Sequence, residues 1–252
     1  MNLEERARFI RTFKAASTLK PYRRDYEKLT KIHAEHFAGI HTLRHFFPFH
    51  RWYILKLENL LRKIDCRVTV PYWDWSKAVS SNSLWRSTNT HDVWNPAEHG
   101  LGGNGDGPDF CVQNGPFHKN AWNMVSWMKN CSCFRRAFAK NPRINNESYV
   151  RRSFRFPQNK FRCFEYIVRS NLHSAFHNSV RGTMDLRASS TAPEFWLHHG
   201  FMDKLWSDWQ NRGPRFVISS LCNNDNDNHD DDDDNDDNDN HENSHDRLQP
   251  RP

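Results

Sequence analysis

Histidines are concentrated in two short stretches of this sequence, and such a distribution points to transition-metal chemistry. The chain contains 15 histidines. Five of them lie within the 18 residues from His33 to His50, and four lie within the 27 residues from His173 to His199. The neutral imidazole ring is a common side-chain ligand for copper, zinc, iron and nickel. The two stretches are therefore candidates for two metal sites.

The second stretch contains a pair, His173 and His177, with the spacing of one helical turn. On a helix, side chains four residues apart lie on the same face, where two imidazoles can bind one metal ion. The same spacing also occurs in packed or exposed pairs, which are more frequent. The zinc-protease motif HExxH is not present, because Ser174 stands in place of its glutamate. A further doublet, His198–His199, follows apolar residues at the start of another helix and favours a shared metal site.

The first stretch offers three histidines at wider spacing, because His33, His41 and His50 are separated by eight and nine residues. This spacing takes them from one helix, through a loop, to the start of the next helix. Two such groups of three neutral ligands, each carried by a helix pair, describe two metal ions that face each other inside a four-helix bundle.

The elements that must position these histidines are helices. Hydrophobic residues recur at helical spacing in several segments, and Pro21 divides the first of them into two helices that join near residues 17–21. Residues 77–157 are rich in Gly, Pro, Asn and Ser, which predicts a long irregular connection with a short helix at about 119–128. The predicted fold class is mainly α, a four-helix bundle with long irregular connections. Its helices are expected over about residues 3–37, 49–64, 161–180 and 193–210.

The charge distribution divides the chain into two parts. Of the 36 basic and 30 acidic residues, two basic and 12 acidic ones lie in residues 221–252, so this tail has a net charge of −10. Residues 1–220 carry the remaining charges, a net of +16. The tail is rich in Asp and Asn and almost free of apolar residues, so it cannot offset the entropy cost of ordering. We therefore expect one ordered domain, which carries the two histidine stretches, over residues 1–220 and a disordered acidic tail over 221–252.

The basic domain invites a nucleic-acid interpretation, because Lys and Arg bind phosphate groups. The sequence nevertheless has no helix-turn-helix pattern, no zinc-finger spacing and no aromatic RNA-binding motif. Its charges are dispersed along helix-like segments, as on a solvated surface. We therefore expect no nucleic-acid partner. A membrane span is not expected either, because no run of about 18 apolar residues occurs.

The six cysteines are even in number, but they do not form a zinc-binding pattern, because no CxxC pair occurs. Two or three disulfide bonds, formed in an oxidising compartment, are the favoured interpretation. The first residues are charged throughout and cannot form the apolar core of a signal peptide. A missing upstream segment would reconcile these two observations.

Two longer strings of residues resemble known copper motifs. The string HAEHFAGIHTLRHFFPFHRWYILKLENLL, followed by VPYWDWS, is similar to the first copper motif of the tyrosinase family of type-3 copper proteins. The string HSAFHNSVRGTMDLRASSTAPEFWLHHGFMDKLWSDWQ is similar to the second copper motif of that family. The resemblance extends over about residues 4–210. It implies a helical bundle that holds two copper ions, with O2 as co-substrate.

The resemblance assigns roles to individual residues. Phe195 matches the phenylalanine that lies over the copper pair, although plain core packing also explains it. Arg51 and Asp203 match an ion pair between two helices of the family. His198 then becomes a neighbour of the second copper rather than a ligand. The six implied ligands are His33, His41 and His50 for the first copper ion and His173, His177 and His199 for the second.

The resemblance also implies a base for phenol substrates. In tyrosinases, a glutamate upstream of the second copper motif and an asparagine after its first histidine hold a water molecule that accepts the phenol proton. Glu165 matches the glutamate, although a surface carboxylate on a helix is an equally good interpretation. Ser174 stands in place of the asparagine and holds water less firmly. Oxidation of diphenols is therefore expected, whereas the departure at Ser174 counts against hydroxylation of monophenols such as tyrosine.

The expected function is thus a copper-dependent oxidoreductase that uses O2 to convert o-diphenols into o-quinones, with small phenols or protein tyrosines as substrates. The resemblance also implies secretion, or location in the lumen of the secretory pathway. Three alternatives stay open: an O2 carrier of haemocyanin type with the same six histidines, a copper-poor structural protein of an extracellular matrix, and a zinc hydrolase. Phenol turnover, reversible O2 binding and metal analysis distinguish these alternatives.

Overall fold

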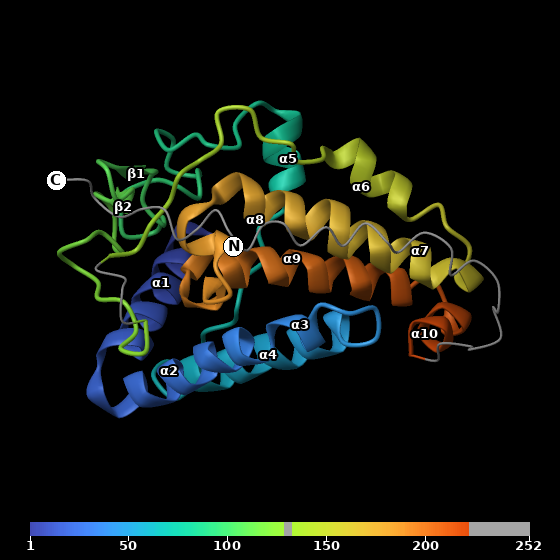
Figure 1. Ribbon diagram of the computed structural model, residues 1–252, viewed down its shortest axis with the longest axis horizontal. Helices are drawn as coiled ribbons and strands as arrows, with labels where there is room; N and C mark the ends of the chain where they lie inside the picture. The colour runs from blue at the N-terminus through green and yellow to red at the C-terminus, as the bar shows by residue number, and fades with distance from the viewer. Residues whose placement is uncertain (129–132, 222–252) are drawn as a thin grey trace, which may run out of the picture. The chain divides into compact units, whose positions relative to one another are not determined.

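The computed structural model describes residues 1–128 and 133–221, and the fold over these residues is mainly α, as predicted (Figure 1). The expectations for Cys131, Cys222 and the acidic tail lie outside the described residues. Within the two described ranges, no helix combines the length and the apolar character that crossing a membrane requires.

The first two helices, α1 (Leu3–Thr18) and α2 (Lys20–Glu35), are divided by Leu19, whose backbone is extended. Pro21 lies in the first turn of α2. A proline is tolerated there because the first N–H groups of a helix have no partner within the helix. The predicted pair of helices with a join near residues 17–21 is confirmed.

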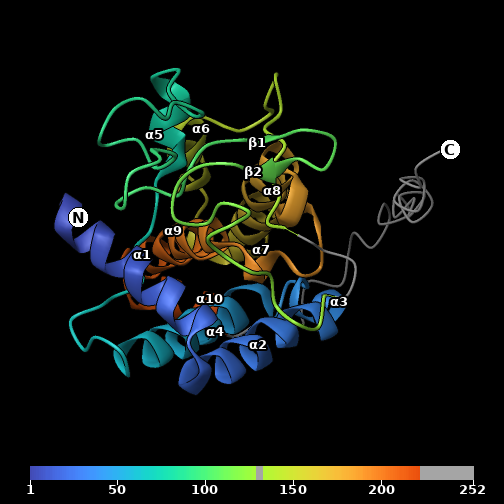
Figure 2. The ribbon, with the colours of Figure 1, turned by 90° about the vertical axis from the view of Figure 1, so that its left-hand side faces the viewer.

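The helical segments that carry the histidines pack side by side as a bundle (Figures 1 and 2). α2 packs against α4 (Phe46–Arg62), and α4 packs against α9 (Pro193–Gln210). α9 in turn packs against the helical segment that precedes α8 (Ser174–Val180). The helices predicted over residues 49–64 and 193–210 are therefore present, and both belong to the bundle.

Two buried tyrosines fasten the helices of the bundle to one another. The hydroxyl of Tyr53 on α4 donates a hydrogen bond to the Leu29 carbonyl on α2 at 2.9 Å. The hydroxyl of Tyr26 on α2 donates to the Thr191 carbonyl, just before α9, also at 2.9 Å. A buried hydroxyl group is stable only when it is hydrogen-bonded. These bonds therefore hold α2 against two of its neighbours.

The segment predicted as one helix over residues 161–180 is interrupted by a π-helix. α7 (Phe161–Tyr166) leads into the π-helical segment Ile167–His173, which is followed by α8 (Ser174–Val180). A π-helical turn takes up one more residue than an α-helical turn. It therefore changes the direction of the side chains that follow, and it sets how His173 and α8 face the bundle.

The long connection contains only short elements. These include α5 (Trp75–Ser80), α6 (Glu147–Ser153) and an antiparallel pair of strands, β1 (Gly105–Asp106) with β2 (Cys111–Val112). The remaining described elements are short helices next to the bundle: α3 (Phe37–Ile40), α10 (Pro214–Leu221), and the 3-10 helices η1 (Gln158–Lys160), η3 (Gly182–Asp185) and η4 (Ser189–Thr191).

The predicted helix over residues 119–128 is wrong. The chain makes turns there, one of them closed by a hydrogen bond from the Trp122 backbone N–H to the His118 carbonyl. The side chain of Trp122 is buried, and its indole N–H donates to the Ser17 hydroxyl on α1 at 2.7 Å. A contact between distant segments thus overrides the local helical pattern.

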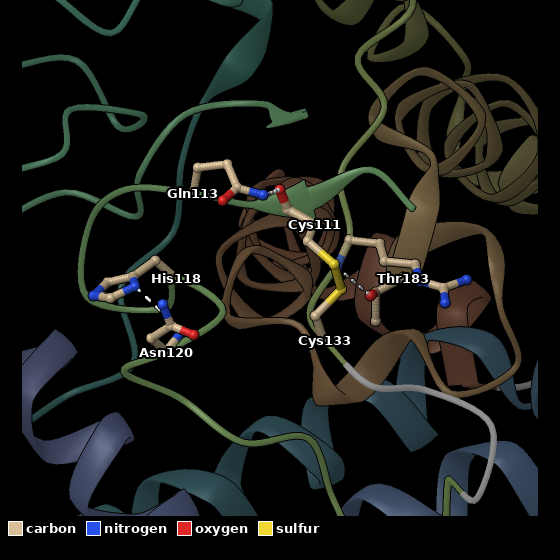
Figure 3. The surroundings of a disulfide bond; sticks show 7 residues. Cys111, Gln113, His118, Asn120, Cys133 and Thr183 are labelled. Atoms are coloured by element: carbon tan, nitrogen blue, oxygen red, sulfur yellow. Dashed lines mark hydrogen bonds between the residues drawn. A yellow bond between two sulfur atoms is a disulfide. The ribbon is translucent and has the colours of Figure 1, made fainter. Parts of the chain in front are cut away.

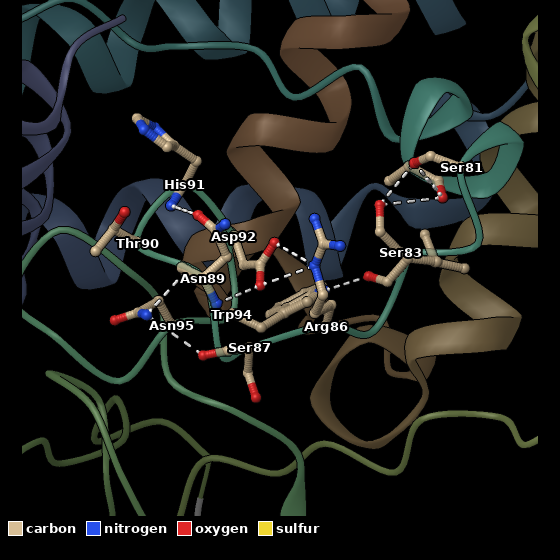
Figure 4. Close-up of polar contacts among 12 residues, drawn as sticks. Ser81, Ser83, Arg86, Ser87, Asn89, Thr90, His91, Asp92, Trp94 and Asn95 are labelled. Carbon is tan, nitrogen blue, oxygen red and sulfur yellow. Dashed lines mark hydrogen bonds and ion pairs between the residues drawn. The ribbon is translucent and has the colours of Figure 1, made fainter.

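Polar side chains hold the early part of the connection in place of regular secondary structure (Figure 4). The Arg86 guanidinium forms an ion pair with the Asp92 carboxylate at 3.0 Å. The same carboxylate accepts a hydrogen bond from the Asn89 backbone N–H at 2.8 Å. The indole N–H of Trp94 donates to the Leu84 carbonyl at 2.8 Å. Backbone groups of this irregular segment therefore have partners, as buried backbone requires.

One disulfide bond lies in the described part of the chain. It joins Cys111 on β2 to Cys133, with Cα atoms 5.7 Å apart (Figure 3). Cys66, in the turn after α4, and Cys163, on α7, are exposed and take part in no disulfide within the described ranges. The expectation of disulfide bonding is therefore confirmed for one bond in the described residues, and the expected number of two or three stays a prediction.

An ion pair with no exposed surface joins the connection to α9. Arg136 and Glu194 are both 0% exposed, and the guanidinium contacts the two carboxylate oxygens at 2.8 and 3.0 Å. The guanidinium also donates to the carbonyls of Leu101, Gly102 and Gly103 at 3.0, 2.8 and 3.0 Å. It thereby fastens the glycine-rich segment over the start of α9. The sequence did not reveal this pair, because its members are 58 residues apart.

Candidate metal centre

The first group of histidines comes from three successive elements, as their spacing predicted. His33 lies on α2, His41 follows α3, and His50 lies near the start of α4. One ring nitrogen from each of the three lies within 4.8 Å of the others. His33 and His50 are buried, and His41 is partly exposed. The arrangement allows one metal ion to contact all three rings.

The second group contains four histidines rather than three. His173 ends the π-helical segment, His177 follows one turn later on α8, and His198 and His199 lie on α9. One ring nitrogen from each of the four lies within 4.8 Å of the others. The structure therefore brings His198, expected as a neighbour of the metal, within the same distance limit as the three expected ligands.

The two groups face each other inside the bundle. The His50 ring on α4 stacks on the His199 ring on α9, with centroids 4.2 Å apart and planes inclined by 10°. The centroids of the His41 and His173 rings are 5.4 Å apart. Each contact joins a member of the first group to a member of the second. Two metal ions, one in each group, would therefore be neighbours.

Buried phenylalanines pack against both groups. The Phe195 ring lies 4.1 Å from the His199 ring and 5.0 Å from the His33 ring, measured between centroids. Phe46 also contacts a histidine from each group. These apolar rings exclude water from the space between the groups and restrict the movement of the imidazoles. Phe195 thus contacts histidines of both groups and also belongs to the hydrophobic core, and its place over a copper pair stays a prediction.

Backbone carbonyls select the tautomer of five of these histidine rings. A carbonyl oxygen only accepts hydrogen bonds, so the ring nitrogen that faces it must carry the proton. That nitrogen is Nδ1 in all five rings, which leaves the lone pair of the neutral imidazole on Nε2. The distances from Nδ1 to the carbonyl oxygen are 2.9 Å for His33 and Arg187, 2.7 Å for His41 and Phe37, 2.7 Å for His50 and Phe46, 3.2 Å for His173 and Arg169, and 2.7 Å for His177 and Met184.

Several of the opposite ring nitrogens are buried without a hydrogen-bond partner in the described ranges. Buried polar atoms without a partner are rare in folded proteins, because such an atom loses its hydration and gains no hydrogen bond in return. A metal ion between the rings would supply the missing partner, and a set of neutral imidazoles suits copper. The atoms concerned are Nε2 of His33, His50, His173, His177 and His198, and both ring nitrogens of His199.

His198 is held in a different way from these rings. Its Nδ1 atom accepts a hydrogen bond from the indole N–H of Trp75 at 3.1 Å. The indole N–H is a donor only, so the nitrogen that faces it cannot carry a proton. Neutral His198 must therefore carry its proton on Nε2. The ring lies flat against Phe176, with centroids 4.4 Å apart and planes inclined by 14°.

Burial keeps the imidazoles of both groups neutral. Desolvation, followed by the effect of His41, lowers the pKa of His33 to about 3. Desolvation also lowers the pKa of His177 to about 4, although its hydrogen bond to Met184 acts in the opposite direction. Neutral imidazoles bind metal ions without first losing a proton. Desolvation is likewise the largest cause that lowers the pKa of His41, His50, His173, His198 and His199.

The metal-free protein is therefore expected to lose stability in mild acid. Because the folded-state pKa values of His33 and His177 lie below the ordinary 6.5, the unfolded chain binds more protons than the folded chain. The free energy of unfolding is highest above pH 6.5. It falls towards pH 4 by about 1.4 kcal/mol per pH unit for each histidine. Urea unfolding of the metal-free chain at several pH values measures this slope. Replacing His177 with asparagine should make the slope shallower, and an unchanged slope would contradict the assignment.

A cavity of about 130 Å³ opens beside the two groups. His41 of the first group and His173 and His177 of the second contribute to its wall, together with Phe37 and Ser174. The cavity is smaller than the 300–1,000 Å³ that is usual for drug-sized ligands. It therefore suits a small molecule that reaches both histidine groups at once.

Glu165 is not among the residues that line this cavity. Its side chain is 0% exposed, and one carboxylate oxygen forms an ion pair with Arg169 at 2.7 Å. The other oxygen is buried and has no hydrogen-bond partner among the described residues. Burial raises the pKa of Glu165, and the charge of Arg169 opposes this rise. The alternative that Glu165 is a surface carboxylate is therefore wrong, because α7 packs this side chain inward.

Ser174 lines the cavity next to His173. Its hydroxyl donates a hydrogen bond to the Arg169 carbonyl at 3.2 Å, and the Nδ1 atom of His173 donates to the same oxygen. Arg169 thus contacts Glu165 through its side chain and Ser174 through its backbone. Glu165 and Ser174, the two residues expected to hold a water molecule, are therefore connected through Arg169.

Trp75 and Arg169 are residues of this region that the sequence did not single out. A signal for Arg169 was present, because it follows Glu165 by four residues, the spacing of a helical ion pair. Trp75 lies in the VPYWDWS string, but its contact with His198 spans 123 residues. No local pattern indicates such a contact.

The ion pair expected between two helices is present. The Nε atom of Arg51 on α4 lies 2.6 Å from an oxygen of Asp203 on α9. The side chains are 37% and 30% exposed, so the pair is only partly buried. The guanidinium also lies over the Trp206 ring, 3.8 Å from its centroid. The pair therefore fastens two helices that carry histidines of opposite groups.

Replacing Asp203 with alanine is expected to weaken folding and copper loading more than it changes substrate choice. The substitution leaves Arg51 partly buried without this carboxylate, at a cost of about 1 kcal/mol for a partly exposed pair. Thermal unfolding, copper content and KM for catechol measure the three effects. Asp208→Ala is the matched control, because Asp208 pairs with Lys204 on the same helix. A soluble, copper-replete but inactive Asp203→Ala protein would contradict the expectation.

Known proteins are similar to this chain in both sequence and fold. Residues 23–212 match the model of the common central domain of tyrosinase. The chain is 34% identical to a tyrosinase of Streptomyces glaucescens over 192 residues, which are 69% of this chain and 65% of that protein. It is 33% identical to a tyrosinase of Streptomyces antibioticus, with the same coverage of 69% and 65%. The matched part thus spans somewhat less than two thirds of these relatives.

A solved structure has a similar fold. A polyphenol oxidase variant from Thermothelomyces thermophila superposes with a TM-score of 0.64 at 21% sequence identity, over 86% of this chain and 69% of that chain. At this identity the likeness concerns the fold alone. The match to the central-domain model extends over most of the sequence and includes all the histidines of the two groups. The chain therefore belongs to the tyrosinase family.

Proposed function

We propose that this protein is a copper-dependent oxidoreductase that uses O2 to oxidise o-diphenols to o-quinones. The observation that carries the proposal is the set of buried ring nitrogens without partners in the described residues, arranged in two groups that face each other. Membership of the tyrosinase family supports copper as the metal. The proposed ligands are His33, His41 and His50 for one copper ion and His173, His177 and His199 for the other.

The residues around the proposed ligands have three roles: they orient the rings, exclude bulk water and form the substrate cavity. Backbone carbonyls engage Nδ1 of five of the rings, which leaves the Nε2 lone pair of each ring to bind copper. Phe46 and Phe195 keep bulk water away from the space between the groups. The cavity of about 130 Å³ beside His41 and His173 is the proposed binding place of the phenol ring. The bound copper pair would supply the transfer of electrons from the phenol to O2.

Diphenols are the proposed preferred substrates, and tyrosine-like monophenols are proposed to react more slowly. Monophenol hydroxylation needs a base for the phenol proton, and a water held by Glu165 and Ser174 is the candidate. Arg169 already occupies one oxygen of Glu165, and the Ser174 hydroxyl already donates to a carbonyl. Both contacts weaken the hold on such a water. Small phenols fit the cavity best, and a protein tyrosine would have to insert its ring alone.

One observation favours an oxidase over an O2 carrier, and another supports an oxidising compartment. An O2 carrier needs no phenol access, whereas here a cavity reaches histidines of both groups. The Cys111–Cys133 disulfide supports an oxidising compartment, because such bonds rarely persist in the reducing cytosol. We therefore include secretion, or passage through the secretory lumen, in the proposal.

The test is copper reconstitution of the full chain, followed by metal analysis and O2 uptake. We expect two copper ions per chain and faster O2 uptake with catechol than with tyrosine. Reversible O2 binding without turnover of catechol would favour a carrier. A protein that does not bind copper but hydrolyses substrates when loaded with zinc would be a hydrolase. The carrier result and the hydrolase result would each overturn the proposal.

A further inference from the structure

The second histidine group has one imidazole more than an open metal site requires. One ring nitrogen from each of His173, His177, His198 and His199 lies within 4.8 Å of the others. Four protein ligands close a tetrahedral site, whereas three leave a position for a reacting molecule. The number of imidazoles that can donate a lone pair therefore decides whether this site can react with O2.

Hydrogen bonding removes His198 from the set of available ligands. Its Nδ1 lone pair is occupied by the indole N–H of Trp75 at 3.1 Å. Its Nε2 atom then carries the proton, so neither nitrogen has a lone pair to offer. His173 and His177 have the opposite arrangement, because their Nδ1 atoms face backbone carbonyls. The distinction lies in the partner of Nδ1, since a carbonyl oxygen accepts a hydrogen bond and an indole N–H donates one.

Trp75 is well placed to maintain this arrangement. Its side chain is 0% exposed. Its ring stacks against Phe176, with centroids 5.8 Å apart, and meets Phe201 edge-on at 5.3 Å. Phe176 also lies flat on the His198 ring at 4.4 Å. Both members of the hydrogen bond are therefore held by the same packed rings, and the indole N–H faces the Nδ1 atom of His198.

We propose that Trp75 keeps the second metal site open by holding His198 in the tautomer that cannot bind a metal ion. Trp75 is thus a positioning residue, which acts through His198 and touches neither substrate nor metal. This proposal rests on the proposed function, in which His173, His177 and His199 hold the second copper ion. The chain thus brings four imidazoles together, and the hydrogen bond from Trp75 prevents one of them, His198, from binding the metal ion.

The decisive variant is Trp75→Phe, which keeps an aromatic ring and removes the N–H donor. With a lone pair of His198 released, the second metal ion gains a fourth imidazole. We expect copper release to a chelator to slow by about tenfold, the scale on which outer partners alter metal affinity. We expect catechol turnover to fall at the same time. Loss of packing alone predicts the opposite result for the metal, because a loosened site releases copper faster.

Two further variants separate these explanations. Trp122→Phe removes another buried indole donor, which bonds to Ser17 away from the histidines, and should change neither copper release nor turnover. The double variant Trp75→Phe with His198→Phe should return copper release to the rate of the unmodified protein. The proposal is overturned if Trp75→Phe releases copper faster, or if slow release persists in the double variant.

A spectroscopic test needs neither turnover nor a variant. In the zinc-loaded full chain, two-bond ¹⁵N–¹H correlation spectra report which nitrogen of each imidazole carries a proton. We expect His198 to carry it on Nε2 and to remain unbound to zinc. A proton on Nδ1, or zinc bound to His198, overturns the proposal whether or not Trp75→Phe folds. Failure of the proposed oxidase function would instead appear as absent catechol turnover with this tautomer intact.

Discussion

Replacing His199 with alanine is expected to remove one copper ion from the protein and to lower catechol turnover by more than about a hundredfold. Changes to outer partners of metal ligands already cost 10–100-fold, so loss of a ligand should cost more. Both ring nitrogens of His199 are buried and have no hydrogen-bond partner in the part of the chain that is described. The substitution therefore breaks no side-chain hydrogen bond among the described residues, and its main effect should be on the metal.

The measurements for this variant are the copper-to-protein ratio and the rate of O2 uptake with catechol. His36→Ala is the control, because His36 is an exposed histidine of the first stretch that lies outside both groups. It should retain two copper ions and full turnover. A His199→Ala protein that keeps two copper ions, or keeps its catechol rate, would remove the basis of the proposed dinuclear site.

Replacing Arg136 with methionine is expected to destabilise the protein by about 3–5 kcal/mol, because one partner of a buried ion pair is removed. The Glu194 carboxylate would remain 0% exposed without its counter-charge. Three carbonyls of the glycine-rich segment would also lose their donor. Since Glu194 lies in the first turn of α9, the loss should loosen the helix that carries His199.

Urea unfolding measures this loss, and two variants sharpen its interpretation. Arg151→Met is the control, because Arg151 is 75% exposed in its pair with Glu147 and should cost less than about 1 kcal/mol. The double variant Arg136→Met with Glu194→Leu has no unpaired buried carboxylate, so it should be more stable than Arg136→Met alone. A loss of below about 1 kcal/mol in Arg136→Met would mean that the pair is not the fastening between connection and bundle.

The two predictions concern buried polar groups of opposite kinds. Arg136 and Glu194 satisfy each other, so they stabilise the fold only while both are present. The histidine nitrogens are not satisfied by the described chain, so they weaken the metal-free fold and favour the metal-bound one. Metal loading should accordingly raise thermal stability, whereas the ion pair should act with or without metal.

Local patterns were sufficient for the helices of the bundle and for the sets of histidines. Apolar spacing and Pro21 located the helices over residues 3–37, 49–64 and 193–210, because these signals act within a few residues. The long copper-motif strings named all the histidines that the structure brings into two groups. The same local reasoning failed at residues 119–128, where the buried Trp122 side chain, bonded to α1, outweighed helical propensity.

The sequence by itself determined which residue types this protein has for binding metal and the helices that carry them. Only the tertiary structure decided that Glu165 is buried against Arg169, that Arg136 fastens the glycine-rich segment, and that His198 carries its proton on Nε2. The physical reason is that a ring tautomer or a buried charge depends on the partner that faces it. Such partners come from distant positions in the chain, and they meet only when the bundle has formed.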